Sequence, residues 1–388
     1  MITSRTTSSR SAGRRRALTA LAAAVTAATT LAAGLPAASA TPASPTTVPA
    51  MAPTVRPAAT ASSGLYGVQD PTYDGVYRQA TAILGLRAVG SRVPASAVSW
   101  LLGQQCPDGG FQAYRAGGGA FCSPTDVSAF TGEDTNSTAT AAMALHRVGR
   151  RAEAARAIGW LRRAQNTDGG WGYVTGAPSD ANSTGLVMAA LRTVGINPRT
   201  VRSAQRRTGV TLVSSLQLRC PAKTADRGAL SYQKPLQANG FATTQGLLGS
   251  VTGLPVARRT PSATSPTMRC SNGRQTRPLT MTAAASGFLA RALGRDGRLP
   301  NAFGPGDDWN ATATAVLALV GAGWGRSAVR TATTALQRNV NAYVVDDSGR
   351  DRPAALGTLL LVARATGVNP RRFGGTDLVA RLRATERP

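Results

Sequence analysis

Two stretches of the chain, DTNSTATAAMALHRVG at 134–149 and DANSTGLVMAALRTVG at 180–195, align without a gap at an offset of 46 residues. A third stretch, DWNATATAVLALVGAG at 308–323, fits the same frame. Each begins with Asp, continues through residues that are small or apolar on nearly every face, and ends in a segment that contains Gly. This pattern predicts helices that are buried on most sides and stopped by glycine.

Weaker copies of this repeat occur at 76–90, 239–253 and 352–367. The leucines that anchor the six copies are Leu86, Leu145, Leu191, Leu248, Leu319 and Leu361. Amphipathic segments with arginines on one face alternate with them and predict further helices at 95–105, 151–165, 200–218, 281–293, 327–341 and 377–384. Such self-similarity is typical of repeat architectures. An open solenoid would expose the inner faces or need polar caps. We therefore predict an all-α fold, an α6/α6 toroid (barrel) of six inner and six outer helices over residues 64–388.

Glycine-rich turns follow two of the amphipathic segments, QQCPDGGF at 104–111 and QNTDGGWGY at 165–173. Gln at a helix end can bond freed backbone groups, the glycines permit positive φ, and an aromatic residue seals the junction. We expect structural roles for Trp100, Gln105, Phe111, Trp160, Gln165 and Trp171. The W-L-x3-Q-x-x-D-G-G-[FW] pattern resembles the repeat of the terpenoid cyclase and protein prenyltransferase α/α-toroid superfamily. The resemblance implies that functional groups lie where the inner helices begin.

Polar residues gather at these helix starts. The ligand-binding candidates are Asp134, Asn136, Asp180, Asn182, Asn239 and Asn310, and the catalytic candidates are Asp307 and Asp308. In class II terpene cyclases an inner helix begins with D-x-D-D-T, whose middle Asp protonates an alkene. When the motif's Thr is set on Thr138, Thr184 and Thr312, the middle position falls on an Asn in every copy. An amide is no strong acid, so the resemblance implies a missing general acid.

The same polar residues have other interpretations. Asp, Asn, Ser and Thr before an apolar run are typical helix N-caps, each contributing about 0.5–2 kcal/mol. A ligand-binding ring and a Ca²⁺ site built from their oxygens remain open. The N-x-[ST] triplets at these positions follow from capping rather than glycosylation. Zinc as in prenyltransferase β subunits is not expected, because the single histidine, His146, is at the far end of its helix. We expect no cofactor and no metal.

The chain has 388 residues, 44 of them basic and 18 acidic, and a net charge of +26. This charge favours anionic partners such as a cell-envelope polymer. No specific nucleic-acid binding is expected, because no long basic run occurs and only 5% of residues are aromatic.

Residues 1–40 predict an export signal. A basic segment at 5–16 precedes an apolar segment at 17–35, and Ala38-Ser39-Ala40 forms an A-x-A site with cleavage after Ala40. Residues 41–63 form a Pro/Ala/Thr-rich linker. The mature protein is then secreted, without a transmembrane segment. In that oxidising compartment we favour the bridges Cys106–Cys122 and Cys220–Cys270 among three connectivities.

We therefore expect a secreted, non-catalytic protein that binds a hydrophobic or isoprenoid-like small molecule, or a cell-envelope component, in the barrel. The first alternative is a terpene cyclase or prenyltransferase-like enzyme that acts on an isoprenoid substrate. The second is a cell-wall adapter without a small ligand.

Overall fold

The computed structural model describes residues 63–116, 122–294 and 296–388. The chain divides into two units, 1–58 and 59–388, and all described residues belong to the second. The predicted export signal and nearly all of the predicted linker therefore lie outside the described residues. In the described part, no helix combines the length and apolar character needed to cross a membrane.

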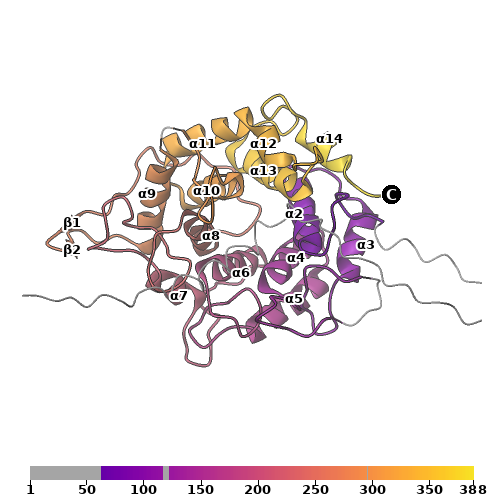
Figure 1. Ribbon diagram of the computed structural model, residues 1–388, viewed down its shortest axis with the longest axis horizontal. Helices are drawn as coiled ribbons and strands as arrows, with labels where there is room; N and C mark the ends of the chain where they lie inside the picture. The colour runs from indigo at the N-terminus through magenta and orange to yellow at the C-terminus, as the bar shows by residue number, and fades with distance from the viewer. Residues whose placement is uncertain (1–62, 117–121, 295) are drawn as a thin grey trace, which may run out of the picture. The chain divides into compact units, whose positions relative to one another are not determined.

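In the described residues, helices form at all six apolar repeats. They are α2 (Gly75–Ala88), α4 (Thr135–Arg147), α6 (Ala181–Thr193), α8 (Gly240–Val251), α10 (Trp309–Ala322) and α13 (Pro353–Thr366). Each contacts the next in chain order, and α13 also contacts α2, so the series closes on itself (Figure 1). These helices are buried on most sides, as the sequence predicted; in α10 every residue from Ala311 to Val320 is buried. The closure excludes the open solenoid.

A second set of helices packs against this inner set (Figure 1). They are α3 (Ala95–Gly103), α5 (Arg151–Arg163), α7 (Gly209–Ser215), α9 (Met281–Leu293), α11 (Arg326–Arg338), α12 (Val340–Val344) and α14 (Leu378–Arg383). Except for α12, each contacts the inner helix that precedes it in the chain. A two-stranded antiparallel hairpin, β1 (Cys270–Ser271) and β2 (Arg274–Gln275), lies in the connection before α9. The fold is an all-α toroid, as predicted.

Two of the predicted outer helices differ from the structure. Only Gly209–Ser215 is helical within 200–218, because Thr208 and Thr211 form a capping box that starts the helix there. Arg206, with φ of 60°, also breaks any helix before that point. The segment 327–341 is divided at Asn339, whose side-chain amide donates to the carbonyl of Ala335 at 2.8 Å. The second piece becomes the separate helix α12.

A threonine in the first turn of four inner helices fixes the turn that precedes each helix. Thr184 Oγ1 accepts a hydrogen bond from the amide of Trp171, 13 residues earlier, at 2.9 Å. The amides of Leu230 and Leu299 make the same bond, at the same spacing, to Thr243 and Thr312. In the first copy Phe111 bonds Thr138 across 27 residues, because the Gly-rich turn carries an insertion. The turn and the next helix therefore form one repeating unit.

The inner helices approach closely where glycines face each other. A Cβ added to Gly85 of α2 would lie 2.5 Å from the carbonyl oxygen of Gly357 on α13. Gly185 of α6 and Gly249 of α8 face each other in the same way. Only glycine allows such backbone contact, so these positions confirm the expected close packing of small residues.

The Gly-rich turns are built as predicted. Gln105 and Gln165 donate from their side-chain amides to the carbonyls of Gly109 and Gly169, at 3.1 and 2.8 Å. Both glycines have positive φ, 104° and 90°. The four aromatic residues Trp100, Phe111, Trp160 and Trp171 are buried. The structure also contains disulfides between Cys106 and Cys122 and between Cys220 and Cys270, the pairing in sequence order.

Candidate functional site

Four of the candidate residues cap the inner helices. Asp134, Asp180 and Asp308 each accept, through Oδ1, the amide of the residue three positions later, at 2.6, 2.7 and 2.7 Å. Asn239 does the same for Ala242 at 2.8 Å. The capping interpretation is therefore confirmed for these four side chains.

The capping interpretation is wrong for Asn136, Asn182 and Asn310. Each is the second residue of its helix, two positions after the N-cap, so its side chain does not act as the N-cap. Asn310 instead accepts a hydrogen bond from the hydroxyl of Tyr343 at 3.0 Å. Asn182 is buried, and Oδ1 of Asn136 is buried without a hydrogen-bond partner in the described part of the chain. In the sequence alignment these three asparagines are the residues set against the middle Asp of the D-x-D-D-T motif.

Two of the capping carboxyl groups have a raised pKa. Asp134 and Asp180 are each 1% exposed. Burial raises the pKa of each to about 7, against the opposing effect of the hydrogen bonds from Ser137 and Ser183. Burial also raises the pKa of Asp308, which is only half-buried. A substantial fraction of Asp134 and Asp180 therefore keeps its proton at neutral pH.

Tyrosines from the next repeat lie beside these carboxyl groups. The charge of Asp134, followed by burial, raises the pKa of Tyr173. Burial and Asp180, which is also its hydrogen-bond partner, raise the pKa of Tyr232. The carbonyls of the two tyrosines accept the first amides of α4 and α6, at 2.8 and 2.9 Å. Sequence reasoning missed both, although each precedes the repeated threonine of its unit by the same number of residues.

An aromatic cluster adjoins Asp180. The rings of Tyr232 and Phe241 each lie edge-on to Phe303, with centroids 6.2 and 5.7 Å apart. Tyr232 and Phe303 are half-buried, as is Trp309, the first residue of α10. The starts of α6, α8 and α10 thus combine apolar rings with buried polar groups, as small-molecule sites do.

The other catalytic candidate, Asp307, lies at the surface. Its Oδ2 accepts from Arg298 Nη1 at 2.7 Å, and both side chains are substantially exposed. An exposed ion pair of this kind contributes little to stability. The structure therefore separates Asp307 from the buried acids.

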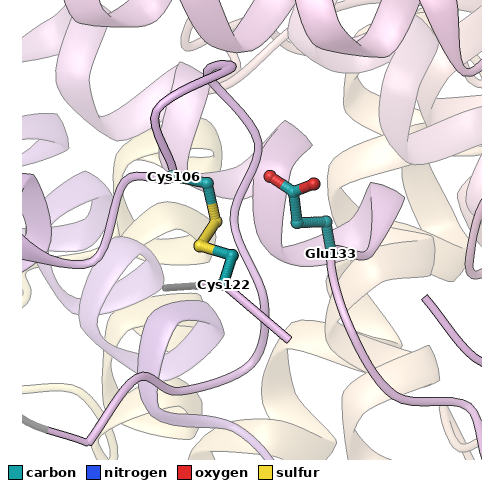
Figure 2. Close-up of side chains that lie close together, drawn as sticks. All are labelled: Cys106, Cys122 and Glu133. Carbon is teal, nitrogen blue, oxygen red and sulfur yellow. A yellow bond between two sulfur atoms is a disulfide. The ribbon is translucent and has the colours of Figure 1, made fainter. Parts of the chain in front are cut away.

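One group of potential metal ligands occurs in the described residues. Figure 2 shows the Cys106–Cys122 disulfide next to Glu133. Both sulfurs are bonded to each other, so neither is available as the thiolate that binds zinc. Burial and the nearby carboxylate of Asp108 raise the pKa of Glu133, and Glu133 Oε2 accepts from Trp160 Nε1 at 3.3 Å. These residues do not fit a metal site.

The chain resembles solved toroid structures. A variant of the type II terpene cyclase MstE from Scytonema, in complex with geranylgeranyl dihydroxybenzoate, matches with a TM-score of 0.51 and 15% identity over 80% of each chain. The chain has the toroid fold of a type II terpene cyclase. The resemblance predicted from the Gly-rich turns is confirmed for the fold.

Two further structures are similar over much of the chain. The ent-copalyl diphosphate synthase from Streptomyces platensis matches with a TM-score of 0.47 and 16% identity, over 76% of this chain and 51% of that one. A protein from Actinoplanes matches with a TM-score of 0.33 and 19% identity, over 74% of this chain and 98% of that one. No protein-family model and no curated protein sequence matches the chain.

Proposed function

We propose that the protein is a secreted, non-catalytic binder of a hydrophobic, isoprenoid-like small molecule, held in the barrel where the inner helices begin. The observation that carries the proposal is the cluster of Tyr232, Phe241 and Phe303 next to Asp180. Half-buried rings offer apolar surface to a ligand, and the neighbouring amides and hydroxyls can orient it.

Unpartnered polar atoms on consecutive inner helices support the same location. Asp134 Oδ2, Asn136 Oδ1, Ser183 Oγ and Gln245 Oε1 are buried without a hydrogen-bond partner among the described residues. They belong to α4, α6 and α8 or to the cap of α4. A buried polar atom left unpaired costs roughly 1–3 kcal/mol, so a ligand with a hydroxyl or carbonyl group would recover part of that cost.

The protein is proposed to be non-catalytic because asparagines stand in place of the acidic residue that the cyclase motif requires. In the D-x-D-D-T motif that the sequence resembles, the middle Asp is the acid that protonates the substrate. Here Asn136, Asn182 and Asn310 stand at the middle position, and the neighbouring Asp side chains are engaged as helix caps. The disulfides fit an extracellular protein. A cell-envelope component remains the other ligand class that the positive charge favours.

Binding is tested with geranylgeraniol, an uncharged isoprenoid alcohol, by native mass spectrometry of disulfide-intact protein. We expect a saturable complex that Phe303→Ala weakens by about tenfold, the effect of losing about 1.4 kcal/mol of ring contact. The matched control is Trp324→Ala, a half-buried aromatic just beyond the opposite end of α10, which should leave binding unchanged. Phe303→Leu keeps an apolar side chain at this position and removes only the ring, so it distinguishes a loss of aromatic contact from a loss of folding. No complex, or equal weakening in both alanine variants, would overturn the proposal.

One observation favours the enzymatic alternative: Asp134 and Asp180 hold a proton near neutral pH. The test is incubation with squalene and oxidosqualene, followed by gas chromatography–mass spectrometry of the extracts. We expect no cyclic product, because a carboxyl group that caps a helix is not poised against an alkene. A cyclic product that disappears in Asp180→Ala or Asp308→Ala would replace the binding proposal with an enzymatic one.

A further inference from the structure

A hollow of about 680 Å³ lies at the end of the barrel opposite to the capping carboxyl groups. Four arginines and the single histidine of the chain line it: Arg87, Arg92, Arg147, Arg151 and His146. Val98 and Val148 add apolar wall. A second hollow of about 290 Å³ shares four of the five polar residues.

The hollow lies between the C-terminal ends of α2 and α4 and the N-terminal turns of α3, which carries Val98, and α5. Arg87 is in the last turn of α2, Arg147 is the last residue of α4, and Arg151 is the first residue of α5. Helix α4 has 13 residues, so its rise of about 1.5 Å per residue places this end about 20 Å from Asp134. The hollow is therefore separate from the site proposed above.

The positive charge of the hollow is not neutralised by the described part of the protein. None of the ion pairs between described residues includes any of the four arginines, and no carboxylate lines the hollow. Arg87 and Arg147 donate only their Nε–H groups, to the carbonyls of Arg147 and Leu254 at 3.3 and 3.0 Å. Their terminal nitrogens, and the side chains of Arg92 and Arg151, remain available as donors in this part of the chain.

We propose that this hollow is a binding site for a phosphate-bearing anion. Guanidinium groups present paired N–H donors that match phosphate oxygens, and charge-assisted bonds of this kind are the strong ones. Four neighbouring cations without an acidic partner repel one another, and a bound phosphate offsets that repulsion. The apolar wall accommodates a carbon-containing part of the ligand. The phosphate belongs either to a soluble compound or to a lipid headgroup.

The site is tested by isothermal titration calorimetry with inorganic diphosphate. The variant R92Q/R151Q removes two exposed arginines that make no side-chain hydrogen bond in the described residues. The control R162Q/R330Q removes two exposed arginines of α5 and α11 that lie outside the hollow, with the same change of net charge. We expect at least about tenfold weaker binding in the first variant and unchanged binding in the second.

The source of the phosphate is distinguished by a second pair of measurements. Binding to phosphatidylglycerol vesicles but not to phosphatidylcholine vesicles, reversed by diphosphate, would assign the site to a lipid headgroup. Diphosphate binding without vesicle binding would assign it to a soluble phosphate compound. In either case the imidazole signal of His146 should shift on saturation. The proposal fails if diphosphate does not bind or if both double variants weaken binding equally.

Discussion

The two ends of the inner helices carry opposite chemistry. At their starts, Asp134, Asp180 and Asp308 cap three of them. Arginines occupy the last turns of four: Arg87, Arg147, Arg192 and Arg364. This arrangement complements the helix dipole, which favours negative groups at the N-terminus and positive groups at the C-terminus.

The two ends also differ in the burial of their charged groups. The acids at the starts of α4 and α6 are enclosed and hydrogen-bonded to their own helices, so they belong to the fold. The arginines around the hollow are exposed and their donors are mostly unused. The carboxyl groups at the first end are therefore structural parts of the helices, whereas the arginine side chains around the hollow face solvent.

The largest effect is expected from Asp180→Asn. A carboxyl group whose pKa rises from 3.8 in the unfolded chain to about 7 in the fold contributes stability at low pH and loses it as pH rises between these values. Asn caps equally well, as Asn239 does for α8, but carries no charge. The variant should therefore gain on the order of 4 kcal/mol over the parent protein at pH 8, and little at pH 4.

Urea unfolding at pH 4, 6 and 8 measures this difference. Asp307→Asn is the control, because it removes a surface carboxylate paired with Arg298 and should change stability by less than about 1 kcal/mol at each pH. If Asp180→Asn is equally destabilising at every pH, the carboxyl group is ionised in the fold. The two ends would then differ in the sign of their charge but not in the effect of burial on it.

A smaller effect, the same at both ends, is expected from two threonine substitutions. Thr184 near the start of α6 accepts the amide of Trp171, and Thr193 at its end accepts the amide of Leu254, each at 2.9 Å. Thr184→Val and Thr193→Val keep the shape but leave a buried amide unpaired, at a cost of about 1–3 kcal/mol each. Thermal unfolding should show similar losses. A loss of stability in only one variant would mean that the hydrogen bonds between helix and loop contribute differently to stability at the two ends.

The repeated residues explain how much of this fold could be predicted. The Asp-to-Thr spacing of 134–138 recurs at 180–184 and 308–312. In each copy the Asp accepts the amide three positions later, and the Thr hydroxyl accepts an amide of the preceding turn. In the copy at 239–253, the sequence alignment is set on Leu248. In the structure, the cap at Asn239 and the bond that Thr243 accepts from Leu230 are the features that correspond to the other copies.

The candidate site was only partly predictable for a different reason. Asn136, Asn182 and Asn310 resemble caps in the sequence because they stand near Asp, and only the backbone distinguishes the cap from the second helical residue. The arginine hollow has no sequence signal. Arg87 and Arg147 are far apart in the chain, and the contact between α2 and α4 brings them together.

The smallest effect concerns His146, whose environment reports directly on the arginine end. Burial, followed by the charges of Arg147 and Arg151, lowers the pKa of His146 below the ordinary 6.5. Removing a neighbouring cation favours the protonated imidazole, so Arg151→Gln should raise this pKa by a fraction of one pH unit, and added salt should act in the same direction by screening. Asp134→Asn, at the opposite end of the same helix, should leave it unchanged. Because the chain has one histidine, its imidazole NMR titration is unambiguous. If the pKa of His146 is unchanged in Arg151→Gln but shifts in Asp134→Asn, the imidazole does not sense the arginines, and the assignment of charge to the two ends is wrong.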